Sequence, residues 1–236
     1  MVRVGAIQSS YIPWRGYFDI IASVDLFVFY DDIQYTKGDW RNRNKVKTLR
    51  GAEWMTVPVS YKSVSQLIAE TPVDPGRWWR QKHLRTWQNH YRSAPYFDAA
   101  MDVLAGFDDP QHTTISQLNI YLIRRICAYL DIKTPMILSS ELSLQGSRTD
   151  RLVDMIKKLG ATTYLSGPSA DAYLDKDAFR THGIQLEYKS YDYDPYPQLW
   201  GDFIGGVTVL DLIANCGHQA KHLMRSRTPD RIMVAK

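Results

Sequence analysis

Two short apolar runs separated by one helix-length segment constrain the fold of this chain most strongly. Residues 2-VRVGAI-7 and 26-LFVFY-30 have the length and composition of buried strands, and 17-YFDIIASV-24 between them reads as a helix. A strand, a helix and a strand in this order form a βαβ unit, in which the two strands pair in parallel with a right-handed crossover. The N-terminus therefore predicts the start of a mostly parallel sheet.

The C-terminal half shows the same alternation of strand and helix patterns. Ser147 and Asp150 have capping-box spacing at the start of one helix, and Gly160 follows its end. Strands are predicted at 135–140, 162–167 and 184–191, and helices at 149–160, 175–182 and 207–217. A third candidate strand of the N-terminal half covers 54–60, and the polar tail from His218 is expected to be loosely held.

The middle of the chain is mostly helical. Helices are predicted at 77–92, 96–107 and 114–132, and the last of them carries a clear apolar stripe. We therefore predict a single α/β domain over residues 1–236, with a mostly parallel, Rossmann-like sheet, flanking helices and a helical insertion at about 77–132.

Composition narrows the class of protein without naming a function. The two cysteines give no disulfide framework, which favours reduced thiols. No signal-peptide pattern and no apolar run of membrane-spanning length is present, so we expect a soluble cytoplasmic protein. The net charge of +4 is compatible with an anionic ligand but too small to suggest that the protein coats nucleic acid.

Polar residues follow both strands of the N-terminal βαβ unit. Gln8, Ser9 and Ser10 come after the first strand, and Asp31 and Asp32 come after the second. Ligands of open parallel sheets bind beyond the carboxyl ends of the strands, so these groups are expected to open into one crevice. The residues expected to line it are Gln8, Tyr11, Trp14, Asp31, Asp32 and Tyr35. Those expected to extend the site are Lys37, Trp40, Arg41, Asn42, Arg43 and Lys45.

These residue types suit a small anionic or amine-bearing ligand. Carboxylates can hold an amine or a metal ion, and Arg or Lys can hold phosphate or carboxylate. A plain solvated loop is the alternative, but such a loop has no need for Trp40 among its charges. Ser166 begins the loop 166-SGPSAD-171, which can present backbone N–H groups to an anion or form a simple turn. No G-x-S-x-G, P-loop, G-x-G-x-x-G or Cys/His metal spacing occurs.

Several longer strings closely resemble the WbqC-like family, in order across nearly the whole chain. They are 8-QSSYIPWRGYFDII-21, 25-DLFVFYDDIQYTKGDWRNRNKVK-47, 54-WMTVPV-59, 148-RTDRLVDMIKKLGATTYLSGPSADAYLD-175, 196-YPQL-199 and 207-VTVLDLIANCG-217. Members often carry proline where this chain has Ser9. The resemblance implies a role in O-antigen or other surface-polysaccharide biosynthesis. It also implies a candidate transferase that adds an amino-acyl group to an amino sugar.

Three functions follow from these observations. The first is acyl or aminoacyl transfer to the amine of a nucleotide-linked amino sugar, with Asp31 or, preferably, Asp32 as the base and Gln8 as an oxyanion donor. Its donor can be a free amino acid with ATP, a thioester or a charged tRNA, which the basic stretch permits but is too short to require. The second is a metal-dependent nucleotidyl- or glycosyltransferase in which Asp31 and Asp32 hold Mg²⁺. The third is a non-catalytic sugar-binding partner in the pathway.

Overall fold

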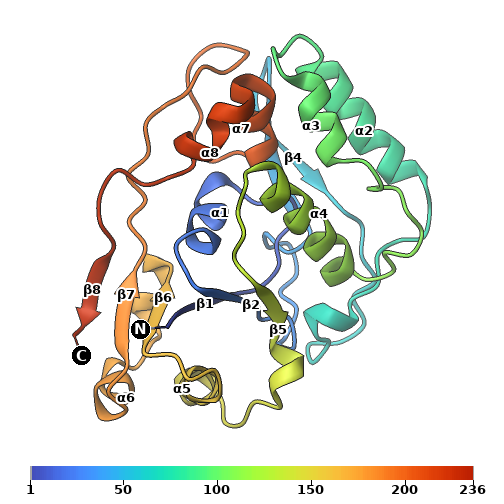
Figure 1. Ribbon diagram of the computed structural model, residues 1–236. Helices are drawn as coiled ribbons and strands as arrows, with labels where there is room; N and C mark the ends of the chain where they lie inside the picture. The colour runs from blue at the N-terminus through green and yellow to red at the C-terminus, as the bar shows by residue number, and fades with distance from the viewer. Residues whose placement is uncertain (1, 236) are drawn as a thin grey trace.

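A computed structural model describes residues 2–235, and a six-stranded sheet runs through its centre (Figure 1). The strand order is β5-β2-β1-β6-β7-β8, and every neighbouring pair is parallel except β7 and β8. The strands are β1 (Arg3–Ile7), β2 (Leu26–Phe29), β5 (Met136–Leu138), β6 (Thr163–Ser166), β7 (Gln185–Tyr188) and β8 (Arg231–Val234). The predicted parallel pairing of the first two strands is confirmed, as is the α/β class.

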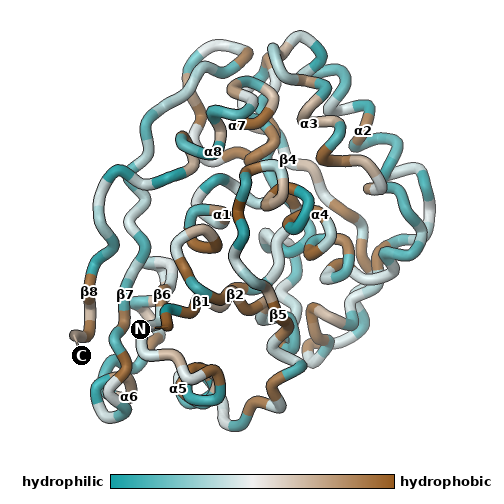
Figure 2. The backbone as a smooth tube through the Cα atoms, viewed as in Figure 1, coloured by the Kyte–Doolittle hydropathy of each residue, from teal (hydrophilic) through white to brown (hydrophobic). Residues whose placement is uncertain are grey.

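Helices cover both faces of the sheet because successive strand side chains point to opposite sides. Phe27 and Phe29 belong to one hydrophobic cluster, and Val28 between them belongs to the other. The first face packs against α1 (Arg15–Ile21), α4 (Ile115–Tyr129) and α7 (Val209–Cys216), and the second against α5 (Arg148–Lys158) and α6 (Lys176–Thr181) (Figure 1). The central strands accordingly form the hydrophobic band of the molecule in Figure 2.

The helices of the middle segment pack on the first face. They are α2 (Trp78–Tyr91), α3 (Phe97–Val103) and α4, close to the predicted positions. Thr114 and Gln117 form a complete capping box at the start of α4, and the predicted stripe on that helix is buried. The buried side chains of these helices share one hydrophobic cluster with α1 and α7. Within residues 2–235, none of the helices combines the length and apolar character needed to cross a bilayer.

The third candidate strand does not join the sheet. It is found as β4 (Gly51–Thr56), which pairs antiparallel with β3 (Arg43–Thr48) in a separate hairpin. The backbone φ of Gly51 is 97°, a conformation that glycine adopts readily in the turn joining the two strands. The basic stretch after residue 42 is therefore a strand with two distinct faces.

The predicted capping box at Ser147 is wrong. The Ser147 side chain makes no capping hydrogen bond, and the following residue, Arg148, has a φ of 49°. A capping box needs helical backbone in the first turn, and this left-handed residue disrupts that geometry. The helix α5 (Arg148–Lys158) still begins within one residue of the predicted start at Thr149.

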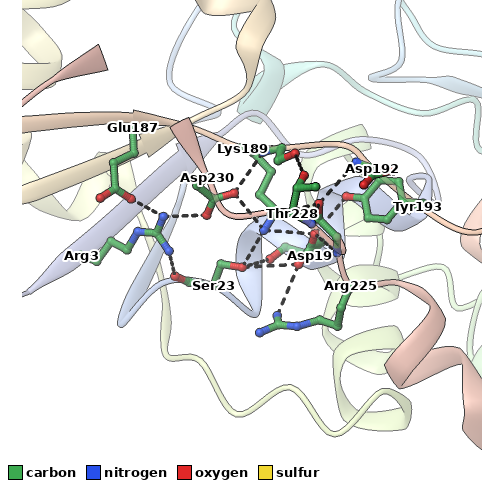
Figure 3. Close-up of polar contacts among 12 residues, drawn as sticks. Arg3, Asp19, Ser23, Glu187, Lys189, Asp192, Tyr193, Arg225, Thr228 and Asp230 are labelled. Carbon is green, nitrogen blue, oxygen red and sulfur yellow. Dashed lines mark hydrogen bonds and ion pairs between the residues drawn. The ribbon is translucent and has the colours of Figure 1, made fainter. Parts of the chain in front are cut away.

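The C-terminal tail is ordered, contrary to the prediction. It forms α8 (Ala220–Leu223) and then β8, which completes the sheet. A buried ionic network holds it in place (Figure 3): Lys189 Nζ lies 3.1 Å from Asp19 Oδ2 and 3.2 Å from Asp230 Oδ1. Arg3 also pairs with Asp230, at 2.7 Å. Buried charges are tolerated only when they are paired, so this network fixes the tail to β1 and α1.

A buried histidine makes the helical layer sensitive to pH. His83 of α2 is 4% exposed, and its Nδ1 lies 2.8 Å from the Tyr11 hydroxyl. Burial lowers the pKa of His83 from 6.5 to about 4. Between these values the unfolded chain binds a proton that the folded chain does not. The stabilisation by neutral His83 is therefore complete above pH 6.5 and is lost as the pH falls toward 4.

We expect the His83→Gln variant to lose this part of the pH dependence of stability. For the parent protein, His83 should lower the free energy of unfolding by about 3 kcal/mol between neutral pH and pH 4. Urea unfolding of both proteins at pH 7 and pH 4 isolates the contribution, because all other titrating groups are shared. An equal pH dependence in the two proteins would contradict a neutral, buried His83.

Candidate functional site

The candidate site is a cavity of about 510 Å³ at the carboxyl ends of β1 and β6. From β1 the chain continues to β2 on one side, and from β6 it continues to β7 on the other side (Figure 1). This is the topological switch point of the sheet, where open α/β proteins bind their ligands. Residues from the loops after both strands line the cavity, among them Gln8, Ser10, Ser166 and Ser169. A cavity thus lies at the sheet edge where the sequence predicts a site.

Arg41 supplies the positive charge of the cavity wall. Its side chain is 8% exposed, and Nη1 donates to Gln8 Oε1 over 2.6 Å. Among residues 2–235, no carboxylate lies within 4.0 Å of its guanidinium, and its Nε has no hydrogen-bond partner. The Arg41 backbone carbonyl accepts from Asn119 Nδ2 at 2.8 Å, so α4 holds the Arg41 backbone in place. A buried guanidinium on a cavity wall is suited to bind an anion.

The loop after β1 is strained and firmly held. Ile12 has a φ of 41°, a conformation that is unusual for a β-branched residue. Asn44 Nδ2 donates to the carbonyl oxygens of Tyr11 at 3.1 Å and Ile12 at 2.7 Å. The Tyr11 amide donates to the Trp40 carbonyl at 3.0 Å. These bonds, from side chain and backbone alike, stabilise the loop in the shape that opens the cavity.

Aromatic rings form much of the remaining wall. The Trp14 indole lies edge-on to Tyr191, with ring centroids 4.9 Å apart. Gly16 makes room for it, because a Cβ at this position would stand 2.4 Å from the indole. Trp40 and Tyr173 also line the cavity and are 43% and 70% exposed. Exposed rings beside a cavity can contact the faces of sugars or bases.

Asp31 was expected to line the crevice but lies within the fold. It is 4% exposed, and its carboxylate accepts from the Ser9 amide at 2.7 Å and from Ser116 Oγ at 2.5 Å. Burial raises the pKa of Asp31, and the hydrogen bonds from Ser116 and Ser9 oppose that rise. This carboxylate therefore ties the loop after β1 to α4.

Asp32 likewise stands apart from the cavity wall. Arg151 Nη2 donates to its Oδ2 over 2.6 Å, and the Ser139 hydroxyl donates to its Oδ1. The Asp32 carboxylate thus connects the end of β2 to α5 and to the segment after β5. Adjacent residues of an extended chain point in opposite directions, which explains why Asp31 and Asp32 have separate partners.

Other predicted site residues are divided between the core and the surface. Tyr11 and Tyr35 are buried, and Asn42 is buried with its amide donating to the Val57 carbonyl at 2.8 Å. Lys37 is exposed. Arg43 and Lys45 lie on the outer face of β3, where both contact the Trp54 ring. Of the predicted set, the structure brings Gln8, Trp14, Trp40, Arg41 and Ser166 together in the cavity, which Asn44 also lines.

Two aromatic residues of the wall lie outside the predicted set. Tyr173 and Tyr191 come from loops more than a hundred positions downstream of Trp14, and no local pattern linked them to it. Tyr191 follows β7 closely, so its position after a strand was the available signal. Within residues 2–235, no group of three or more His, Cys, Asp or Glu side chains is placed to hold a metal ion.

We expect replacement of Asp31 to destabilise the protein in proportion to the hydrogen bonds lost. Asp31→Ala leaves the Ser9 amide and the Ser116 hydroxyl buried without a partner, which costs about 3 kcal/mol. Asp31→Asn can still accept from Ser9 and donate to Ser116, so its cost should be only about 1 kcal/mol. Urea unfolding measures both values. Equal stability of the parent and the Ala variant would show that the carboxylate does not hold the loop.

Comparison with known proteins places these residues in one family. The WbqC-like protein family matches residues 8–223, a span that includes the loop after β1, the hairpin and α7. The chain is also 45% identical over 228 residues to uncharacterized protein Rv1507c of Mycobacterium tuberculosis, covering 95% of this chain and 98% of that protein. No solved structure matches significantly. This chain therefore belongs to the WbqC-like protein family.

Proposed function

We propose that this protein is a transferase of surface-polysaccharide biosynthesis, of the O-antigen type. Its substrate is a nucleotide-linked amino sugar bound in the cavity after β1 and β6, and it transfers an acyl or aminoacyl group to the sugar amine. Membership of the WbqC-like family supports the pathway. The chemistry of the cavity wall supports the ligand class.

The observation that carries this proposal is the buried guanidinium of Arg41. The Arg41 guanidinium donates to the neutral Gln8 oxygen, and the Asp31 carboxylate, whose charge interacts with Arg41, is not within 4.0 Å of it. Burying a charge with no opposite charge in direct contact is costly. A phosphate group offers several acceptor oxygens in the geometry that a guanidinium recognises best. The phosphate that joins a sugar to its nucleotide carrier meets this requirement.

The rest of the wall suits a sugar. Trp14 and Tyr191 present ring edges and faces, which pack against the apolar faces of a pyranose. Ser10 and Ser166 add hydroxyl groups that can pair with sugar hydroxyls. A mostly apolar wall with a few placed polar groups is typical of small-molecule sites.

We infer that the protein positions the amine and the acyl donor and does not act as an acid or a base. In the reaction, the amine nitrogen forms a bond to the acyl carbon, the bond to the leaving group breaks, and the nitrogen loses a proton. Among the described residues, the cavity wall includes no Asp, Glu, His, Cys or Lys side chain. We assign that proton to the departing group or to water, and we assign Gln8 as a donor to the developing oxyanion.

A second candidate function is favoured by the same lack of acid–base groups. A non-catalytic sugar-binding protein needs only the anion site and the aromatic wall. If this candidate function is correct, the protein binds the nucleotide-linked sugar but transfers no group to it from any acyl donor. The metal-dependent alternative draws on Asp31 and Asp32, whose oxygens are already engaged by Ser9, Ser116 and Arg151.

We expect Arg41→Gln to weaken the binding of phosphate-bearing ligands strongly. Loss of a charge-assisted contact is worth about 1.5–3 kcal/mol, which corresponds to a roughly 10- to 150-fold weaker affinity. Titration calorimetry with UDP-glucosamine and with inorganic pyrophosphate gives this measurement. Arg50→Gln is the matched control, because Arg50 lies at the hairpin turn and pairs with Glu53 outside the cavity. Unchanged affinity in the Arg41 variant would remove the central support of the proposal.

Turnover distinguishes the two candidate functions. We expect Gln8→Ala to lower single-turnover acyl transfer about 100-fold, as for loss of an oxyanion donor, while folded Asp31→Asn and Asp32→Asn retain most activity. The assay uses UDP-glucosamine with an amino acid and ATP, an acyl thioester or an aminoacyl-tRNA as donor. Binding without transfer from any donor would favour the sugar-binding candidate. Loss of activity in folded Asp31→Asn or Asp32→Asn would instead show that a carboxylate takes part in the reaction.

A further inference from the structure

Beside the cavity lies a pair of exposed tryptophans, Trp54 on β4 and Trp40 in the segment just before β3. Trp40 and Trp54 are 43% and 44% exposed, and their ring centroids lie 5.2 Å apart. Exposed large apolar side chains that gather in one place mark a binding surface more often than single ones do. Trp40 also lines the cavity, so this surface, which we call the indole platform, is continuous with the candidate site.

The strand register explains why the indole platform is flanked by positive charge. Lys45 and Trp54 are direct cross-strand partners, and side chains alternate between the two faces of the hairpin. Asn44 and Val46 are buried on the inner face, whereas Arg43 and Lys45 lie on the outer face. The guanidinium carbon of Arg43 is 4.3 Å from the Trp54 ring centroid, and Lys45 Nζ is 5.0 Å from it.

These cations are not used in ion pairs within the fold. No carboxylate of residues 2–235 lies within 4.0 Å of either charged group. Cation–π contact with Trp54 positions them, yet it leaves their positive charge uncompensated. The surface therefore combines aromatic rings for stacking with charge for an anion, and the buried Arg41 lies next along the same stretch of chain.

We propose that the indole platform binds the nucleoside of the nucleotide-linked substrate. The base stacks on the exposed tryptophan surface, Arg43 and Lys45 neutralise its phosphates, and the sugar extends past Arg41 into the cavity. Stacking on an aromatic side chain is tolerant of base identity, because every base has a π-face. The platform is one small hairpin face, which matches a single nucleoside better than a nucleic-acid strand.

This inference rests on the proposed anion site at Arg41, and the experiment separates the two. Titration calorimetry compares UDP and ADP with inorganic pyrophosphate, which carries the charge but no base. We expect the nucleotides to bind about tenfold or more tightly than pyrophosphate, as one base–aromatic stack provides. Trp54→Ala should remove this difference, weakening the nucleotides far more than pyrophosphate, because Arg41, Arg43 and Lys45 all remain. Arg41→Gln should weaken all three ligands.

Two controls define the contribution of the platform. Trp78 of α2 is 57% exposed and lies outside the cavity wall, so Trp78→Ala tests the effect of losing any surface indole. Tryptophan fluorescence should be quenched by UDP in the parent and the Trp78 variant, and less so in the Trp54 variant. The folding of each variant is checked by thermal unfolding.

Each outcome decides the proposal. Equal affinity for UDP and pyrophosphate, with no effect of Trp54→Ala, would overturn the platform while leaving the anion site intact. Failure of UDP, ADP and pyrophosphate to bind would overturn both. A short oligouridylate that binds through Trp54 far more tightly than UDP would replace the single nucleoside with single-stranded nucleic acid as the partner.

Discussion

The loop between β1 and α1 depends on buried hydrogen bonds from side chains that are distant in the sequence. The Asp31 carboxylate holds the Ser9 amide, and the Asn44 amide holds the carbonyls of Tyr11 and Ile12. Each of these groups would otherwise be buried without a partner, at a cost of about 1–3 kcal/mol. Their combined effect keeps Ile12 in its unusual backbone conformation and keeps the cavity open. The shape of the site is therefore set by polar contacts as much as by apolar packing.

The polar stretch after β2 serves two purposes. Asp31, Asn42 and Asn44 are buried and bond to the backbone or to other loops, so they are structural. Arg41 and Arg43 have no ion-pair partner among residues 2–235 and lie beside the cavity and the indole platform. Within β3, strand alternation places Asn44 on the inner face and Arg43 on the outer face. A run of charges that looks uniform in sequence thus becomes a structural layer and a ligand-facing layer.

The sequence predicted the features that depend on local pattern. The βαβ unit, the stripe of α4 and the edge of the sheet where Gln8 and Arg41 lie all follow from short-range periodicity and from the rule for parallel sheets. Features that depend on distant partners were not predicted. Asp31 meets Ser116 from a helix 85 positions away, and no spacing within the stretch indicates that contact.

The ordered structure of the C-terminal tail was not predicted for the same reason, because it depends on partners that are distant in the sequence. Local composition suggested a loosely held polar segment, but Asp230 pairs with Arg3 and Lys189 near the sheet. Buried ions specify a unique arrangement because any other arrangement leaves a charge unpaired. The strand β3 was not predicted because its many cations obscure the alternation of buried and outward-facing side chains. In this strand the buried Asn44 and Val46 alternate with Arg43 and Lys45 on the outer face.

The ionic network of the tail and the aromatic wall of the cavity form one continuous structure. Asp19 of α1 accepts from the Tyr193 hydroxyl at 3.0 Å (Figure 3) and from the Ser226 amide at 2.9 Å. Both Tyr193 and Tyr191 pack edge-on against Trp14, which lines the cavity. Because Asp19 is buried, its partners cannot leave without exposing an unpaired charge to the core. The charges that order the end of the chain therefore also fix the rings against which the proposed sugar would bind.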